Sequence, residues 1–289
     1  MKTDLTPLDA SKISSLGAGG MLKNVCIVKE KGDIRRFYEK YGGEKILIAG
    51  GLTNTLVLSG GTDEKVLFCG LFKGTEVKSE YIKCLAGERL CAVASEAEKN
   101  ELSGAENISG IPGTVGGAVF GNAGSFGSEI SDLVVNAEVF RTDDGKTEIL
   151  DRRELGFSYR KSILRPDKDF VCEVTLNFKR EQREEIRKKV ISVSAKRAAT
   201  QPKKPSLGSV FKKAGDVSAG FYIEKAGLKG FGYGGMAFSD LHANFIVNKG
   251  GGTPEEYLYL MTLAEKKVFE TFGIRLVREV KVLGESGNS

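Results

Sequence analysis

Short apolar runs separated by amphipathic or glycine-rich segments fill the first third of the chain. The runs at 25–28, 45–51, 56–59, 66–70 and 80–86 predict strands, and residues 32–43 and 90–102 have the spacing of helices. Asp33 is a candidate N-cap for the first helix, and two glycines would end it. A strand, a helix and a second strand that runs into a glycine loop are typical of an α/β unit that binds phosphate at bare backbone amides.

The remaining pattern continues this mixture of strands and helices. Residues 134–150 predict a hairpin with DDG as its turn, 169–180 a strand, 181–199 a charged helix and 244–248 a further strand. A helix opening with TPEE has Thr253 as N-cap, Pro254 at N1 and Glu256 at N3, which is a capping box. The segment QPKKP at 201–205 breaks regular structure. We therefore predict two domains, 1–200 and 201–289.

The last apolar run, IRLVREVKVL at 274–283, predicts a closing strand. Ile274, Leu276, Val280 and Val282 share one face of such a strand, so Glu279 points the other way with Arg275, Val277 and Lys281. A carboxylate beside two cations on a strand is ordinarily a solvated surface group. Periodicity alone therefore argues against a catalytic role for Glu279.

Composition and charge narrow the function classes. The chain has 289 residues, a net charge of +5 and 40% hydrophobic residues, which is typical of a globular protein and lacks the dense basic surface of a nucleic-acid binder. The N-terminus has no apolar signal region and no run is long enough to span a membrane, so we expect a soluble, cytoplasmic protein. Five cysteines without a C-x-x-C pair predict buried, reduced thiols, as in VCIV around Cys26 and FVCEV around Cys172.

A single histidine, His242, excludes several chemistries. Histidine-rich zinc sites need more ligands, and a Ser-His-Asp triad would have to use this one residue. We expect no metal. An enzyme of this composition moves protons with Ser, Tyr, Lys, Glu or Asp, or delegates the chemistry to a cofactor.

Two glycine loops and two short motifs carry candidate chemistry. The loops are AGGLTNT at 49–55 and SGIPGTVGGAVFGNAGSFGSE at 109–129, and each is either a close-packed corner or a backbone cradle for a phosphate-bearing ligand. In SYRKS, Arg160 is either a surface residue with a buried stem or an anchor for a carboxylate. In GSVFK, Ser209 on its own is an ordinary loop hydroxyl.

Six ordered motifs turn these fragments into a resemblance. GIPGTVGGAV…NAG, SYRKS, GSVFK, AGLKG, HANFIVN and REVKVLG resemble the UDP-N-acetylenolpyruvoylglucosamine reductase family, in its shorter form, over about residues 45–284. The resemblance implies an α+β protein: a two-subdomain FAD-binding fold of the PCMH/vanillyl-alcohol-oxidase type (about 1–75 and 76–200) plus a smaller α/β substrate-binding domain. It implies NADPH-dependent reduction of UDP-N-acetylglucosamine enolpyruvate to UDP-N-acetylmuramate through FAD, in peptidoglycan precursor synthesis, by a monomer without nucleic-acid or membrane partners.

The same resemblance assigns roles to residues. The catalytic group is Arg160 and Glu279, which stabilise the enolate, Glu279 as the protonated acid, and Ser209, which donates the proton. The FAD contacts are Ala49, Gly50, Gly51, Leu52, Thr53, Asn54, Thr55, Ile111, Pro112, Gly113, Thr114, Gly116, Gly117, Ala118, Asn122, Ala123, Gly124 and Tyr159. The substrate contacts are Lys212, Lys229, His242 and Lys281, although His242 is equally well explained as a packed residue.

The chain departs from the family motif in the first glycine loop, and two other functions remain possible. The family usually reads GGGSN where this chain has GGLTN, so Leu52 and Thr53 replace a glycine and a serine, and Thr53 keeps the hydroxyl. One alternative is another FAD oxidoreductase with the same flavin domains. Many relatives of that fold tether FAD through histidine, and here the only histidine lies in the third domain. The other is a non-catalytic flavin- or UDP-sugar-binding relative, and the presence of all three catalytic residue types argues against it.

Overall fold

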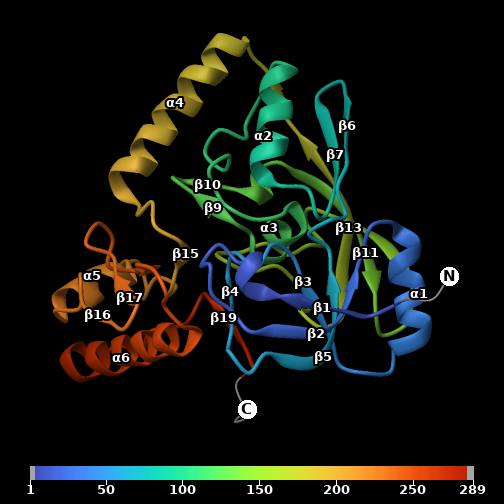
Figure 1. Ribbon diagram of the computed structural model, residues 1–289. Helices are drawn as coiled ribbons and strands as arrows, with labels where there is room; N and C mark the ends of the chain where they lie inside the picture. The colour runs from blue at the N-terminus through green and yellow to red at the C-terminus, as the bar shows by residue number, and fades with distance from the viewer. Residues whose placement is uncertain (1–3, 285–289) are drawn as a thin grey trace. The chain divides into compact units, whose positions relative to one another are not determined.

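The computed structural model describes residues 4–284, which form two compact units (Figure 1). Unit 1 contains Asn24–Gly51 and Glu64–Arg197 together with the residues up to Thr6. Unit 2 contains Pro7–Lys23, Leu52–Asp63 and the chain from Ala198 onward. The change of unit at Ala198 lies close to the predicted boundary, but the sequence did not indicate that two early segments belong with the C-terminal part. The assignment of FAD and substrate binding to separate domains stays a prediction.

Unit 1 is built around a five-stranded antiparallel sheet in the order β12-β11-β13-β7-β6. Its strands are β6 (Thr75–Lys78), β7 (Tyr81–Leu85), β11 (Val134–Arg141), β12 (Thr147–Asp151) and β13 (Asp169–Asn177). The central strand β13 is buried along most of its length, whereas the edge strand β12 has the polar sequence TEILD and is mostly exposed. The predicted hairpin is confirmed, with Ala137 of β11 opposite Leu150 of β12.

The helices of unit 1 are α1 (Lys31–Tyr41), α2 (Leu90–Lys99), α3 (Val115–Gly121), the 3-10 turn η2 (Ile130–Asp132) and α4 (Arg183–Thr200). Helices α2 and α3 pack against β7, and α3 also packs against β13. The prediction that Asp33 caps α1 was wrong, because Glu30 is the N-cap. Asp33 lies in the first turn and accepts hydrogen bonds from the backbone amides of Lys29 and Glu30 at 2.9 and 3.1 Å.

Shorter strands form a second sheet and two small strand pairs. Strands β1 (Thr6–Asp9), β2 (Met21–Ile27), β5 (Thr62–Phe68) and β3 (Ile46–Ala49) form one sheet in that order. Strand β3 is parallel to β5, with Ile48 opposite Leu67, which confirms the strand predicted before the first glycine loop. Two small pairs follow, β8 (Leu102–Ser103) with β14 (Lys179–Arg180) and β9 (Gly124–Ser125) with β10 (Ser128–Glu129).

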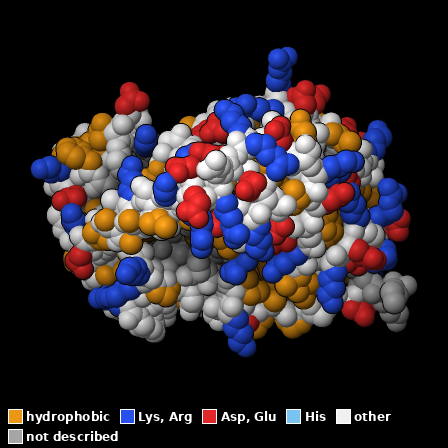
Figure 2. All heavy atoms as spheres, turned by 90° about the horizontal axis from the view of Figure 1, so that it is seen from above, with side chains coloured by type: hydrophobic (Ala, Val, Ile, Leu, Met, Phe, Trp, Pro, Cys, Tyr) orange, Lys and Arg blue, Asp and Glu red, His pale blue; other side chains and the backbone are white. Residues whose placement is uncertain are grey.

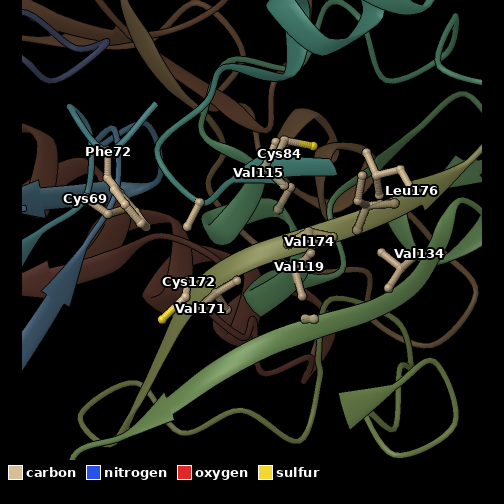
Figure 3. Close-up of a cluster of buried hydrophobic side chains, with 14 of the residues drawn as sticks. Cys69, Phe72, Cys84, Val115, Val119, Val134, Val171, Cys172, Val174 and Leu176 are labelled. Atoms are coloured by element: carbon tan, nitrogen blue, oxygen red, sulfur yellow. The ribbon is translucent and has the colours of Figure 1, made fainter. Parts of the chain in front are cut away.

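Four of the five cysteines lie in the hydrophobic core of unit 1. Cys69, Cys84 and Cys172 are shown among Phe72, Val115, Val119 and Val174 in Figure 3, and Cys26 belongs to the same cluster. Burial raises the pKa of the Cys26 thiol to about 11 and that of the other three to about 12. The prediction of buried thiols is confirmed for these four residues, including Cys26 and Cys172, but it was wrong for Cys91, which is exposed.

We expect one thiol of the native protein to react rapidly with Ellman's reagent. Cys91 is exposed, whereas the other four are buried and their raised pKa keeps them protonated at mildly alkaline pH. Denaturing guanidinium chloride should release all five, and Cys91→Ser should abolish the rapid phase. Rapid reaction of two or more thiols in the native protein would contradict the packing in Figure 3.

Unit 2 contains a four-stranded sheet in the order β15-β18-β17-β16. The elements are the 3-10 turn η1 (Ala10–Lys12), β15 (Ser206–Ser209), α5 (Ala219–Lys225), β16 (Gly232–Tyr233), β17 (Met236–Phe238), β18 (Phe245–Asn248) and α6 (Pro254–Phe272). Helix α6 buries Tyr257, Leu260, Met261, Ala264 and Val268, the spacing of one helical face, and packs on α5 and β17. Its predicted capping box is confirmed, with the Glu256 amide donating to Thr253 Oγ1 at 3.3 Å.

The end of the chain pairs with an early segment of unit 2. Strand β4 (Thr55–Val57) is parallel to β19 (Lys281–Leu283), with Leu56 opposite Val282. The closing strand is shorter than the predicted 274–283, because the backbone bends at Val280 and forms an isolated bridge at Arg278. The predicted alternation is nevertheless confirmed, since Leu276 and Val280 are buried while Arg275, Val277 and Lys281 are exposed.

The surface carries charges of both signs. On the face shown in Figure 2, Lys and Arg side chains are interspersed with Asp and Glu side chains. Ion pairs such as Lys31–Glu138 at 2.5 Å join some of them. Within residues 4–284, every helix is too short or too polar to cross a membrane.

Candidate functional site

Arg160 stands in a tight turn with an unusual backbone conformation. The backbones of Ser158 and Lys161 exchange hydrogen bonds of 3.0 and 3.1 Å, which leaves Tyr159 and Arg160 at the tip. Arg160 has φ +53°, in the left-handed region that side chains rarely adopt. Such strain of about 1–2 kcal/mol persists where the surroundings fix the residue.

The guanidinium of Arg160 is fixed by the loop that follows α3. Its Nη2 donates to the carbonyl of Gly124 at 2.8 Å and its Nη1 to the carbonyl of Asn122 at 3.4 Å. The side chain is 22% exposed. A guanidinium carries five N–H donors, and these two carbonyl bonds orient it. The side chain is therefore fixed in orientation, and its role as an anchor for a carboxylate stays a prediction.

Each of the two glycine loops contains a close-packed glycine. A Cβ on Gly116 would lie 2.8 Å from the Cβ of Ala86, and one on Gly50 would lie 2.7 Å from Oγ1 of Thr114. Thr114 caps α3 by accepting from the amide of Gly117 at 3.3 Å, and the Gly116 amide donates to the carbonyl of Ala86 at 2.8 Å. These amides are already paired within unit 1. The first turn of α3 is therefore a close-packed structural element. Because the amides of Gly116 and Gly117 already have acceptors within the protein, phosphate oxygens need other donors.

The loop after β3 supplies such donors. Among residues 4–284, the backbone amides of Gly50, Gly51 and Leu52 have no acceptor. Leu52 is 3% exposed and has φ +50°, which explains why a glycine suits this position in the motif. Consecutive amides around a left-handed residue form an anion-binding nest. The residues present therefore fit the pyrophosphate of FAD.

The predicted cofactor contacts fall in both units. Ala49–Gly51, Ile111–Gly124 and Tyr159 lie in unit 1, and Leu52–Thr55 lie in unit 2. Of the three predicted catalytic residues, Arg160 lies in unit 1, while Ser209 and Glu279 lie in unit 2.

Within unit 2 the structure brings Ser209 and Glu279 together. Ser209 ends β15, directly after Gly208, whose φ of +79° requires a glycine. The amide of Glu279 donates to the carbonyl of Val210 at 2.8 Å. Two residues that are 70 positions apart in the chain thus lie on adjacent backbone segments. Glu279 is only partly buried, as the face opposite the core requires.

Asn244 holds this arrangement in place, and the sequence analysis did not single it out. Its side chain is 4% exposed and clamps the backbone of Phe211: Oδ1 accepts from the Phe211 amide at 3.0 Å, and Nδ2 donates to the Phe211 carbonyl at 2.8 Å. Its own carbonyl accepts from the amide of Val210 at 2.9 Å. The polar Asn244 within the apolar run HANFIVN was the available signal.

Two further contacts fix the segment that carries Glu279. Asn54 Nδ2 donates to the carbonyl of Glu279 at 3.2 Å, and the amide of Lys281 donates to the carbonyl of Asn54 at 3.0 Å. Next to Glu279, Arg278 makes a two-pronged ion pair with Glu265 of α6, at 2.6 and 2.9 Å. Backbone contacts on both sides of the residue thus fix the position of Glu279.

The predicted substrate-contact lysines lie at different places in unit 2. Lys212 is joined to the same segment as Glu279, because its amide donates to the carbonyl of Val277 at 2.9 Å. Lys281 is exposed at the start of β19. Lys229 is paired with Glu224 at 3.1 Å. Lys212 therefore lies on the segment that is hydrogen-bonded to Val277, two residues before Glu279, and Lys281 lies two residues after Glu279.

His242 has a packing role in the structure. Its Nδ1 accepts a hydrogen bond from the Asn244 amide at 3.2 Å, and its ring packs on Phe245 with centroids 4.9 Å apart. Burial lowers the pKa of His242 below its usual value, so the ring is neutral at pH 7. A neutral ring can donate one hydrogen bond from Nε2 but adds no charge toward a diphosphate.

Comparison with known proteins places these features in a family. Residues 23–151 match the FAD binding domain, and residues 201–283 match the C-terminal domain of UDP-N-acetylenolpyruvoylglucosamine reductase. The chain is 36% identical over 274 residues to the reductase of that name from Thermotoga maritima, covering 93% of this chain and 95% of that one. It is 39% identical over 236 residues to that of Bacillus pumilus, covering 81% and 78%.

A solved structure agrees with the same assignment. The crystal structure of UDP-N-acetylenolpyruvylglucosamine reductase from Thermus caldophilus matches 97% of this chain and 99% of its own, with a TM-score of 0.84 and 33% identity. The match confirms the predicted fold class, an α+β FAD-binding fold with a smaller C-terminal domain.

Proposed function

The chain belongs to the UDP-N-acetylenolpyruvoylglucosamine reductase family, and we propose that it reduces UDP-N-acetylglucosamine enolpyruvate to UDP-N-acetylmuramate. NADPH is the hydride donor and FAD the resident cofactor. The observation that carries the proposal is the placement of Ser209 beside Glu279, through the 2.8 Å bond from the Glu279 amide to the Val210 carbonyl. The bond supports the proposal because it puts the two backbone segments that carry these residues next to each other.

FAD, when bound, takes a hydride from NADPH and gives it to the enolpyruvyl carbon–carbon double bond. The amides of Gly50, Gly51 and Leu52 would hold its pyrophosphate, because they form the nest described above. The close-packed glycines around Thr114 keep the neighbouring backbone free of side chains.

Ser209 supplies the proton of the reduction. Hydride addition at the terminal carbon leaves an electron pair on the carbon that carries the carboxylate. The O–H bond of Ser209 breaks as the new C–H bond forms at that carbon. A hydroxyl is a weak acid, but the forming carbanion is a strong base, so the transfer is chemically matched.

Arg160 and Glu279 stabilise the negative charge that develops on the substrate carboxylate. Arg160 enters the reaction already oriented by the carbonyls of Asn122 and Gly124, so little reorganisation is needed when charge develops. The segment that carries Glu279 is held in part by its backbone, through the bond from the Glu279 amide to the Val210 carbonyl. Lys212, Lys229 and Lys281 offer positive charge for the nucleotide diphosphate.

An absorbance spectrum followed by two additions tests the proposal. The purified protein should be yellow, anaerobic NADPH should bleach it, and the enolpyruvyl substrate should restore the colour. UDP-N-acetylglucosamine, which lacks the double bond, should leave the reduced protein bleached. A colourless protein that FAD cannot reconstitute would contradict the proposal, and so would a reduced flavin that the enolpyruvyl substrate fails to reoxidise.

The organisation of the chain follows from the same proposal. Residues 1–200 serve FAD binding, supported by the match of 23–151, and residues 201–289 serve substrate binding, supported by the match of 201–283. Because NADPH and nucleotide sugars are cytoplasmic metabolites, we expect the enzyme to act in the cytoplasm. We also expect it to be a monomer.

A further inference from the structure

Glu129 is the last residue of the glycine-rich stretch 109–129, and no role has been assigned to it above. Its side chain contacts Arg160 and Asn122. It lies on β10 opposite Gly124 of β9. One carboxylate oxygen, Oε2, accepts a hydrogen bond of 2.6 Å from Nδ2 of Asn122. The other, Oε1, lies 4.0 Å from Nη1 of Arg160. Glu129 therefore contacts both residues whose carbonyls hold the guanidinium, as well as the guanidinium itself.

Asn122 transmits this contact. It is fully buried and ends α3 in the left-handed conformation, with φ +43°. Its Nδ2 also donates to the carbonyl of Ser158, at 3.0 Å, and its Oδ1 accepts from the amide of Ser131, at 3.3 Å. Its carbonyl accepts from Arg160 Nη1. One buried carboxamide thus ties the Arg160 turn to the strand that carries Glu129.

The position of Glu129 is itself determined by the backbone. Its amide donates to Oδ2 of Asp132 at 2.9 Å, at the start of η2. A Cβ on Gly124 would lie 2.8 Å from Cγ of Glu129, so the glycine of the NAG motif leaves room for this side chain. The carboxylate is 35% exposed, so its attraction to Arg160 across 4.0 Å is weakened by water. The short hydrogen bond to Asn122 is the stronger of the two contacts.

We propose that Glu129 is a positioning residue for Arg160. Through its hydrogen bond to Asn122 and its pairing with Gly124, it holds the two carbonyls that orient the guanidinium toward the substrate carboxylate. This role rests on the proposed function, because it matters only in the step that uses Arg160. Glu129 acts through these neighbours and takes no direct part in the chemistry.

Glu129→Ala and Glu129→Gln test the proposal by separating the two half-reactions. In Glu129→Ala we expect the enolpyruvyl substrate to reoxidise the reduced flavin about 10- to 100-fold more slowly, the scale of a small misplacement of a catalytic group. FAD content and the rate of flavin reduction by NADPH should stay close to those of the parent. Glu129→Gln keeps an oxygen acceptor for Asn122 and should recover most of the lost rate. Glu148→Ala is the matched control, because Glu148 pairs with Arg141 at 3.1 Å elsewhere in unit 1.

A second readout does not depend on turnover. The Nε–H resonance of Arg160, assigned in isotope-labelled protein by its loss in Arg160→Lys, should shift or broaden in Glu129→Ala and stay unchanged in Glu148→Ala. An unchanged resonance together with a parent-like reoxidation rate in Glu129→Ala would overturn the role of Glu129. Glu129→Gln as slow as Glu129→Ala would also overturn it, because the hydrogen bond to Asn122 would not be the cause. A parent protein that the substrate fails to reoxidise would overturn the proposed function, and this role with it.

Discussion

Ser209→Ala should leave reduction of the flavin by NADPH close to the parent rate and slow reoxidation by the enolpyruvyl substrate about 10²- to 10⁴-fold, the usual scale for a lost proton donor. The reason is the place of the hydroxyl in the reaction. The hydride transferred from NADPH needs no proton from the protein, whereas the carbanion formed on the substrate needs one. Anaerobic stopped-flow absorbance of the flavin measures both rates separately.

Ser206→Ala is the matched control for this substitution. Ser206 begins the strand that Ser209 ends, and the loss of its hydroxyl removes a weak contact of 3.5 Å with the Gly208 amide. Both half-reactions should therefore stay near the parent rates in Ser206→Ala. Equal damage to the two half-reactions in Ser209→Ala would mean that Ser209 positions the flavin and does not donate the proton.

Glu279→Gln should slow the same step about 10²-fold or more, the cost of removing one group that stabilises charge in a transition state. Glutamine keeps the shape and hydrogen-bonding capacity of the side chain but lacks the ionisable proton. Folding and FAD content should not change, because glutamine leaves the backbone contacts of this residue in place: Glu279 N donates to the Val210 carbonyl at 2.8 Å, and the Glu279 carbonyl accepts from Asn54 Nδ2 at 3.2 Å. Single-turnover reoxidation and a thermal melt measure the two expectations.

Glu270→Gln provides the comparison for the loss of a carboxylate. Glu270 lies on the exposed face of α6, in weak ion pairs of 3.8 and 4.0 Å with Lys266 and Lys267. Its substitution should change neither half-reaction. If Glu279→Gln turned over the substrate as fast as Glu270→Gln, Glu279 would be the solvated surface residue that the strand pattern suggested.

Elements with local signals were predictable from the sequence. Helix α6 is specified by Thr253, Pro254 and Glu256 within four consecutive residues, and the hairpin β11–β12 by its turn residues. Asp33 was misplaced by the same logic, because a carboxylate in the first turn that reaches back resembles an N-cap in a single sequence. Local signals fix an element well and its ends less well.

The candidate site residues could be predicted from the family resemblance but not from the local pattern of the sequence. The resemblance predicts Arg160, Ser209 and Glu279 as catalytic residues, and periodicity could not, because a strand pattern indicates which face is buried and not what the other face contacts. The φ of +53° at Arg160 and the clamp made by Asn244 depend on contacts distant in the chain. Leu52 shows what the family motif alone could not: this departure from glycine keeps a left-handed backbone and buries the leucine side chain.

The parallel pairing of β4 with β19 has a consequence for how the enzyme is made. Residues 281–283 are synthesised 226 positions after their partners at 55–57. Contacts of such long sequence separation form slowly and cannot form before both partners exist. The hydrogen bond from Asn54 to the Glu279 carbonyl therefore forms only after residue 279 has been synthesised. A nascent chain that has not reached residue 279 can fold much of unit 1 but lacks the carboxylate for which we propose a catalytic role, so we expect activity to appear only after this segment is made.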